Sequence, residues 1–460
     1  MANIQTVAGI TGEVYRRGDA GYEAARLDAV WNERRPERYP DVIVVCASEN
    51  DVVEAVRYAV REDLKVSIRS GGHSWVGNGV RDGGLLIDIH NLTDVSIDVA
   101  HKIASVQPAA KGPQIQQLLV EKDLFFPTGH APTVGIGGFI IGGGYGWNSR
   151  AMGPACLSII AIDVVLADGT LVHATDETHP DLMWAVRGSG PGFFGVVTRF
   201  YLKLHDRPTK ILRTVLTFPI ELRDEVMAWG NDNLESIARE IEISAKVGHI
   251  PGSDQEVVSL TTTAFCTPET GENILEPIAQ MPYRSQAIKE IINQEVTIYE
   301  LYDIADALNP PGKRWAVDGI WSDASSAEVL SAAAPLFDNI PSGASFVLWM
   351  IWGSYPEQSN ACWSSQGHVY LSPNSGWDDA ADDLAHEQWV HGELAKLQHL
   401  SVGLQFSDNN LADRPDDGIV PENMKRLEEI RVAYDPTGLF RSYMTLDESA
   451  TAYGKSLRAK

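Results

Sequence analysis

The first 205 residues alternate between strand and helix patterns. DVIVVCAS at 41–48 is rich in β-branched residues, SENDVVEAVRYAVRED at 48–63 repeats apolar residues at helical spacing, and KVSIRS at 65–70 returns to a strand pattern. This order predicts a β-α-β unit. Asp168-Gly169 lies between two apolar runs and indicates a hairpin. Further strands are expected at 84–89, 103–110 and 161–174, and a further helix at 112–123.

The pattern changes after His205, where long strand-like runs are separated by helical stretches. These runs predict an antiparallel sheet with helices on one side, so the fold class is α+β. A last helical stretch, NMKRLEEIRVAY, ends at Asp435-Pro436 because a residue before proline avoids the helical conformation. The strand runs are ILRTVLTFPI at 211–220, EVVSLTTTAFC at 256–266 and SFVLWMIWGS at 345–354, and the helices are expected at 223–240 and 378–398.

Composition and charge narrow the class of partner. The 460 residues contain no apolar run of the roughly 18 residues that a membrane helix needs, and the start lacks the features of a secretion signal. A cytoplasmic protein without a membrane or nucleic-acid partner is expected, since a net charge of −25 repels phosphates. A neutral or cationic small substrate suits this charge better. The four cysteines are far apart in the sequence, which predicts buried free thiols.

Two aromatic and histidine patterns bear on a site. Trp349 and Trp352 are three residues apart on an expected strand, so they point to opposite faces and one of them can face a pocket. His386 and His391 in HEQWVH are five apart, whereas the zinc protease motif needs four. On an α-helix these two side chains diverge by about 140°, so no metal site is expected.

Two glycine clusters carry the candidate chemistry. SIRSGGHSWVGNG at 67–79 places His73 beside a glycine pair, and TGHAPTVGIGGFIIGGGYGWNS at 128–149 holds eight glycines. Such glycines let the backbone turn sharply and approach a ligand, and their bare amides can hold a pyrophosphate. The second cluster matches neither the Rossmann fingerprint nor a P-loop. From these residues alone, His73 is either a histidine in a surface turn or a ligand, base or nucleophile.

Together with DLMWAVRGSGPGFFGVVTRF at 181–200 and YDPTGLF at 434–440, these clusters resemble the berberine-bridge-enzyme-like FAD-linked oxidases of the vanillyl-alcohol-oxidase superfamily. The resemblance implies a two-part FAD-binding domain of the PCMH type at 1–205, a substrate domain at 206–414, and a segment at 415–460 that returns to the first domain. It further implies an enzyme that oxidises a small molecule, with FAD as cofactor and oxygen as acceptor.

In this family the histidine of the first cluster is bonded to the 8α-methyl group of the flavin, which assigns His73 as the covalent anchor. Many relatives carry a cysteine as second anchor; Ala131 stands there, so a single covalent bond is expected. The valine at position 134 is similar to the residue found in family members whose reduced flavin reacts with oxygen. The resemblance therefore implies hydrogen peroxide as a product. The implied cofactor-binding residues are His73, Arg69, Ser70, Gly71, Gly72, Ser74, Gly77, Gly129, Ala131, Thr133, Val134, Gly137, Gly138, Gly142, Gly143, Tyr145, Gly146, Gly195, Val197 and Tyr443.

The resemblance leaves the catalytic base open. Relatives place a glutamate on the strand that reads SFVLWMIWGS here, and a Tyr-x-Asn pattern near residue 404; both are missing. Tyr145, His130 and His368 are the remaining candidates, each with a packing or capping role as alternative. Trp75 with Trp349 or Trp352 is expected to line a pocket for an aromatic or glycosidic alcohol or an amine. Oxidative cyclisation or oxygenation of a polyketide-like substrate, and flavin binding with little turnover, stay as alternatives.

Overall fold

The computed structural model describes residues 7–250, 252–341, 343–356, 358–414 and 418–459. The expected β-α-β unit forms β2 (Val42–Val45), α2 (Glu49–Arg61) and β3 (Val66–Arg69). Ser48 caps α2 by accepting a hydrogen bond from the Asp51 amide. In the sheet, β4 (Leu85–Asp88) lies between β2 and β3 and runs parallel to both, while β1 (Glu13–Arg16) pairs with β2.

A second sheet of five antiparallel strands completes the first half of the chain. Its order is β5-β6-β10-β8-β9, and the predicted hairpin at Asp168-Gly169 joins β8 to β9. Gly169 has φ +77°, which explains the glycine in this turn. The strands are β5 (Val95–Asp98), β6 (Ile103–Val106), β8 (Ile159–Val165), β9 (Leu171–Thr175) and β10 (Val196–Lys203), and a separate pair is β7 (Leu124–Phe125) with β11 (His205–Asp206). The helices here are α1 (Tyr22–Asp28), α3 (Gly112–Val120), α4 (Ile136–Ile141), α5 (Ser149–Met152) and α6 (Pro180–Val186).

The second half builds the predicted antiparallel sheet, which has eight strands. One face carries Leu216, Val247 and Leu260, which form a buried core with Val226 of α7 and Phe337 of α11. The order is β15 (Lys289–Val296), β12 (Lys210–Pro219), β14 (Glu256–Cys266), β13 (Ile241–His249), β18 (Phe346–Ile351), β19 (Val369–Trp377) and β16 (Arg314–Val317), with β17 (Ile320–Ser322) also on β19. The helices are α7 (Arg223–Asp232), α8 (Glu276–Ala279), α9 (Ile298–Leu308), α10 (Ser326–Ala332), α11 (Ala334–Asp338), α12 (Asp383–Glu387) and α13 (Glu393–Lys396).

Two expected helices are shorter or more broken than the pattern predicts. The helix expected at 223–240 ends at Asp232, where the Asn233 side chain donates to the Trp229 carbonyl and competes with helical hydrogen bonding. The stretch expected at 378–398 consists of α12, a π-helical turn at Gln388–Gly392, and α13.

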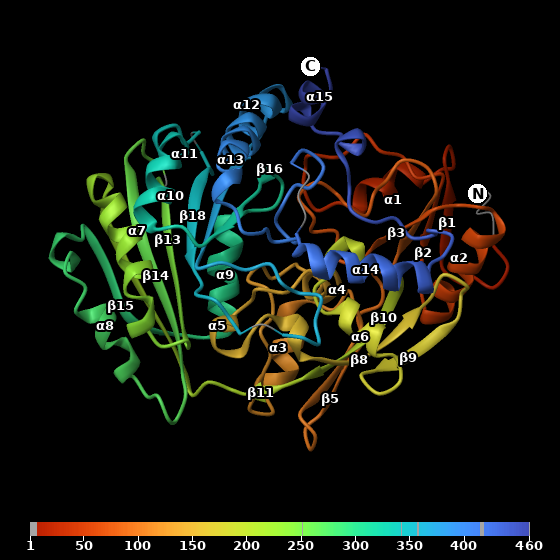
Figure 1. Ribbon diagram of the computed structural model, residues 1–460, viewed down its shortest axis with the longest axis horizontal. Coiled ribbons are helices and arrows are strands. Elements are labelled where there is room, and N and C mark those ends of the chain that lie inside the picture. Colours follow the sequence, from red (N-terminus) through yellow and green to blue (C-terminus); the bar gives the residue numbers. More distant parts are fainter. Residues whose placement is uncertain (1–6, 251, 342, 357, 415–417, 460) are drawn as a thin grey trace.

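The C-terminal part lies against the first half of the chain. Helix α14 (Pro421–Tyr434) packs on α6, and the Val66 amide of β3 donates to the Leu439 carbonyl, so the last residues extend the first sheet's edge. Figure 1 shows the large sheet on one side, the first two sheets on the other, and α14 lying across the latter. The chain ends in α15 (Ala452–Arg458). The expected domain boundary at 414/415 adjoins 415–417, which lie outside the described residues, and the three-segment division stays a prediction.

Two further expectations concern the whole chain. All four cysteines are buried and free, as predicted from their spacing. Within the described ranges, each helix is too short or too polar to span a bilayer.

Candidate active site

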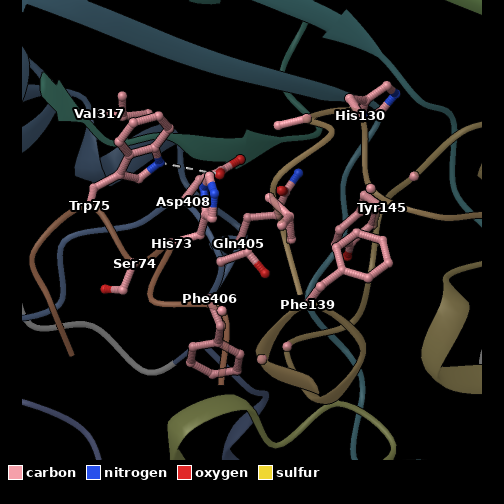
Figure 2. Close-up of a pocket in the computed structure, with 18 of the residues that line it drawn as sticks. His73, Ser74, Trp75, His130, Phe139, Tyr145, Val317, Gln405, Phe406 and Asp408 are labelled. Carbon is pink, nitrogen blue, oxygen red and sulfur yellow. Dashed lines mark hydrogen bonds between the residues drawn. The ribbon is translucent and has the colours of Figure 1, made fainter. Parts of the chain in front are cut away.

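A cavity of about 700 Å³ lies between the glycine-rich loops of the first half and the large sheet of the second. Its volume is within the range of about 300–1,000 Å³ that ligand pockets occupy. Figure 2 shows His73, Trp75 and Asp408 together on one side of this cavity, with Phe139 and Tyr145 opposite them. Residues far apart in the sequence therefore share one site.

The two glycine clusters contact each other at the cavity. A Cβ on Gly71 would stand 2.7 Å from the Gly135 amide nitrogen, and a Cβ on Gly137 would stand 2.8 Å from the Pro108 side chain. Both approaches are too close for any side chain, so glycine is required. A Cβ on Gly138 would meet nothing within 4 Å, and Gly138 lines the cavity. The loops thus pack tightly and leave bare backbone facing the open space.

His73 has a buried nitrogen without a partner. Its Nε2 makes no hydrogen bond, and its ring stacks on Trp31 at a centroid distance of 4.9 Å. Burial, with smaller contributions from the positive charges of Lys111 and Arg69, lowers the pKa of His73 to about 4. The imidazole is therefore neutral at physiological pH and can act as a nucleophile.

These features fit the flavin that the resemblance implies. An unpaired imidazole nitrogen and bare glycine backbone occur together at one cavity, and nearly every residue assigned to the cofactor lines that cavity. Gly143 and Tyr443 are the exceptions; the Tyr443 hydroxyl donates to the Ser189 carbonyl, 2.7 Å away. The lining residues are Arg69, Ser70, Gly71, Gly72, His73, Ser74, Gly77, Gly129, Ala131, Thr133, Val134, Gly137, Gly138, Gly142, Tyr145, Gly146, Gly195 and Val197.

Tyr145, the first candidate base, is held by hydrogen bonds. Its hydroxyl donates to the Ser365 carbonyl and accepts from the Trp363 indole nitrogen at 2.8 Å. Burial raises the pKa of Tyr145 far above its usual value. The ring also packs against Trp321 and Trp352, at centroid distances of 5.1 and 5.0 Å. This environment suits a packing role better than proton transfer.

The two histidine candidates differ in position. His130 lines the cavity, where its Nε2 lies 3.5 Å from a Glu242 carboxylate oxygen and its ring lies edge-on to Trp147. His368 is not among the lining residues; its side chain is half exposed, and its Nδ1 lies 3.9 Å from Asp323. Only His130 is therefore placed to act on a bound molecule.

Asp408 is a site residue that the sequence reasoning missed. Its carboxylate lines the cavity and accepts a long hydrogen bond of 3.4 Å from the Trp75 indole nitrogen. Burial raises the pKa of Asp408 to about 6, although the Trp75 hydrogen bond and the charge of His130 oppose the rise. A carboxyl group with this pKa can accept a proton near neutral pH. The signal was a lone acid in SDNN, beside the missing Tyr-x-Asn pattern.

Of Trp349 and Trp352, one lines the cavity and the other does not, as their spacing suggests. Trp75 and Trp352 line the cavity, whereas Trp349 is fully buried in the core on the helix-covered face of the large sheet.

The two histidines of HEQWVH do not point to a common site: His386 contacts Ser375 at 2.7 Å and His391 contacts Asp318 at 3.2 Å. Among the described residues, no group of three or more potential ligands could hold a metal ion.

Comparison with known proteins identifies a cofactor-binding domain in the first half of the chain. Residues 40–175 match the FAD binding domain family. FAD-linked oxidoreductase penO of Penicillium crustosum is 29% identical over 91% of this chain and 93% of its own length. The chain carries an FAD binding domain and is similar to an FAD-linked oxidoreductase along nearly its whole length. Its fold is that of 6-hydroxy-D-nicotine oxidase from Arthrobacter nicotinovorans (TM-score 0.83, 24% identity, 95% and 98% of the two chains) and of BBE-like 1 from Physcomitrella patens (0.79, 19%, 96% and 97%).

These comparisons confirm several expectations. The resemblance to berberine-bridge-enzyme-like oxidases, the α+β fold, the FAD cofactor and the oxidoreductase class are all correct. Both sheets of the first half and the large sheet of the second half contribute residues to one cavity.

Proposed function

We propose that this FAD-linked oxidoreductase is an oxidase that carries its flavin on His73 by a single covalent bond and oxidises an alcohol or amine carbon of a small molecule. The bound flavin would accept a hydride from the substrate carbon and pass the electrons to oxygen, giving hydrogen peroxide. The unpartnered, neutral imidazole in the cavity is the observation that supports this proposal most directly.

The covalent link rests on the chemistry of His73. The link would join an imidazole nitrogen to the flavin methyl carbon in place of one N–H and one C–H bond, and the two electrons and two protons released would pass to oxygen as hydrogen peroxide. Only a neutral imidazole has the free electron pair for this bond, and the lowered pKa keeps His73 neutral. Ala131 lines the cavity where relatives carry the second anchor, and its methyl group cannot form a link.

Asp408 is proposed as the base that takes the hydroxyl or amine proton of the substrate. It shares the cavity with His73, and its pKa of about 6 leaves it mostly ionised at neutral pH. His130 then stabilises the negative charge of Asp408 from within the same cavity. Tyr145 packs against the cavity wall, and His368 takes no part in the reaction.

Oxidase activity rather than strict dehydrogenase activity is proposed from Val134, which lines the cavity at the position that the family resemblance links to oxygen reactivity. We also propose that residues 1–205 and the C-terminal segment hold the FAD, while residues 206–414 hold the substrate.

The test combines flavin bleaching with peroxide detection. The purified holoenzyme is mixed under anaerobic conditions with a panel of aromatic, glycosidic and aliphatic alcohols and amines, and flavin absorbance is recorded. At least one compound is expected to bleach the flavin, and admitting air restores the colour with about one peroxide per flavin. No bleaching by any compound would favour a flavin-binding protein with little turnover. A product that gains oxygen, or closes a ring, would favour the oxygenase or cyclase alternative over simple loss of two hydrogens.

A further inference from the structure

The cavity-facing side of the large sheet is polar and has an excess of positive charge. Side chains alternate along its strands, so most residues of β12, β14, β13 and β18 that line the cavity stand at every second position, while the residues between them pack under the helices. The alternating residues that line the cavity are Arg213 and Val215; Ser259, Thr261 and Thr263; Glu242, Ser244 and Lys246; and Phe346, Leu348 and Met350. Ile243 and Ile351 of the helix-covered core reach the cavity as well.

Two cations on this wall lack an acidic partner. Arg213 stands opposite Thr263, and Lys246 stands between Ser259 and Leu348. Within the described part of the chain, neither side chain forms an ion pair or a hydrogen bond; the Lys246 ammonium lies 5.4 Å from the centre of the Phe346 ring. Burial alone lowers the pKa of both Arg213 and Lys246, so no carboxylate offsets the cost of holding these charges.

The acids that line the cavity are engaged or belong to other elements. Glu242 contacts His130 and accepts a hydrogen bond from the Asn148 amide. Asp408 accepts from Trp75, and Asp306 lies near the end of α9. The chain has 62 acidic and 37 basic residues, so acids would be the expected partners for half-buried cations such as Arg213 and Lys246. Their absence beside Arg213 and Lys246 leaves two charges for a ligand to neutralise.

Burying a cation without a partner costs free energy, and a bound anion would recover it. We propose that the substrate is an organic anion whose carboxylate binds Lys246, with Arg213 binding a second polar or anionic group farther along the same molecule. This inference rests on the proposed function, because it assigns the substrate class of that oxidase. The proposed anion differs from the neutral or cationic substrate expected from the net charge of the chain. The ligand contacts the local positive charge of the cavity wall, and this charge differs in sign from the net charge.

Strand spacing sets the size of this anion. Lys246, Leu348 and Ser372 occupy one row across β13, β18 and β19. Two strand spacings, roughly 10 Å, therefore separate Lys246 from β19. The Tyr370 hydroxyl of β19 donates to Asn409, the neighbour of Asp408, at 3.2 Å. A substrate that reacts beside Asp408 while its carboxylate reaches Lys246 thus needs a body of about this length, and Leu348 favours an apolar one.

A pair of probes that differ only in charge tests the proposal. 4′-(Hydroxymethyl)biphenyl-4-carboxylate has an oxidisable alcohol and a carboxylate at opposite ends of an apolar body, and its carboxamide is neutral and nearly the same shape. Binding of each to the holoenzyme is measured by titration calorimetry under anaerobic conditions. The carboxylate is expected to bind about 10–100-fold more tightly than the carboxamide, the range of one charge-assisted hydrogen bond, and added salt should narrow the difference.

Variants connect that preference to the wall. Lys246→Met keeps most of the length of the side chain and removes its charge. The carboxylate and the carboxamide should then bind with about equal affinity. Lys289→Met, on the exposed face of β15 in the same sheet, is the control and should keep the wild-type preference. Arg213→Gln should leave the affinity for both probes within about twofold, because Arg213 lies on β12, beyond Lys246, and neither probe has a further polar group to reach it. Flavin absorbance and melting temperature establish that each variant is folded.

Equal affinity of wild type for the two probes, binding of neither, or an unchanged preference in Lys246→Met would each overturn the proposal. The measurement needs neither turnover nor a covalent flavin. A preference for the carboxylate without any peroxide release would therefore refute the proposed oxidase and leave the anion site in place. Peroxide release from neutral alcohols alone would refute the anion site and leave the proposed oxidase in place.

Discussion

Asn in place of Asp408 should slow the enzyme and stabilise the fold at the same time. The carboxamide keeps the shape and still accepts the Trp75 hydrogen bond, but it cannot take a proton. Loss of a positioned general base typically lowers the rate by about 10²–10⁴-fold. The effect on stability follows from the raised pKa of Asp408.

The rise in the pKa of Asp408 from 3.8 to about 6 corresponds to at most about 3 kcal/mol against the ionised form. Solvation of the carboxylate from within the cavity reduces this to about 1–3 kcal/mol. Between these two pH values the folded chain binds more protons than the unfolded chain, so the free energy of unfolding falls as pH rises and stays lower above pH 6. The free energy of unfolding of Asp408→Asn does not fall in this way, because asparagine does not ionise. The melting temperature of the variant should therefore match that of wild type near pH 4 and lie about 1–3 °C higher at pH 8.

Two assays check this prediction. Wild-type kcat/KM, measured by peroxide release with the best substrate of the panel, should rise with pH through about 6 and then level, because only the carboxylate accepts the proton. Asp408→Asn should lack that rise, and Asp303→Asn, exposed on α9, should behave as wild type. A variant with activity within about fivefold of wild type and an unchanged pH profile would refute Asp408 as the base.

Three further substitutions separate the roles of neighbouring residues. Tyr145→Phe leaves the Trp363 indole and the Ser365 carbonyl without a partner, so the free energy of unfolding should fall by about 1–3 kcal/mol while kcat stays within a few-fold; a hundredfold slower enzyme of normal stability would instead make Tyr145 the base. Gly137→Ala should lower the melting temperature of the flavin-free chain because its Cβ collides with Pro108. Gly138→Ala has open space for its Cβ, so it should lower FAD content without that loss, and equal destabilisation by both substitutions would contradict this account of the loops.

The glycine-rich side of the cavity could be predicted from the sequence because its information is local. Gly71 and Gly137 are needed where the two glycine clusters pack closely, and such a requirement is visible in a short motif. Strand periodicity likewise identified β14 and placed Trp349 and Trp352 on different sides.

The side of the cavity built by Asp408 and the large sheet could not be predicted in the same way. The raised pKa of Asp408 depends on burial by Trp75 and other residues more than three hundred positions away, and no local pattern contains that proximity. Arg213 and Lys246 look like ordinary polar positions of half-buried strands until the sheet brings them to a cavity without acidic partners. The end of α7 at Asp232 was missed because side-chain hydrogen bonds of Asn233 compete with the helix.

The most direct test of the central claim is mass spectrometry of the acid-denatured holoenzyme after proteolysis. The account predicts that the peptide containing His73 carries the mass of FAD, that no second peptide does, and that the label disappears in His73→Ala while His130→Ala keeps it. Flavin that separates fully from the wild-type chain on denaturation, or that stays attached in His73→Ala, would contradict the claim.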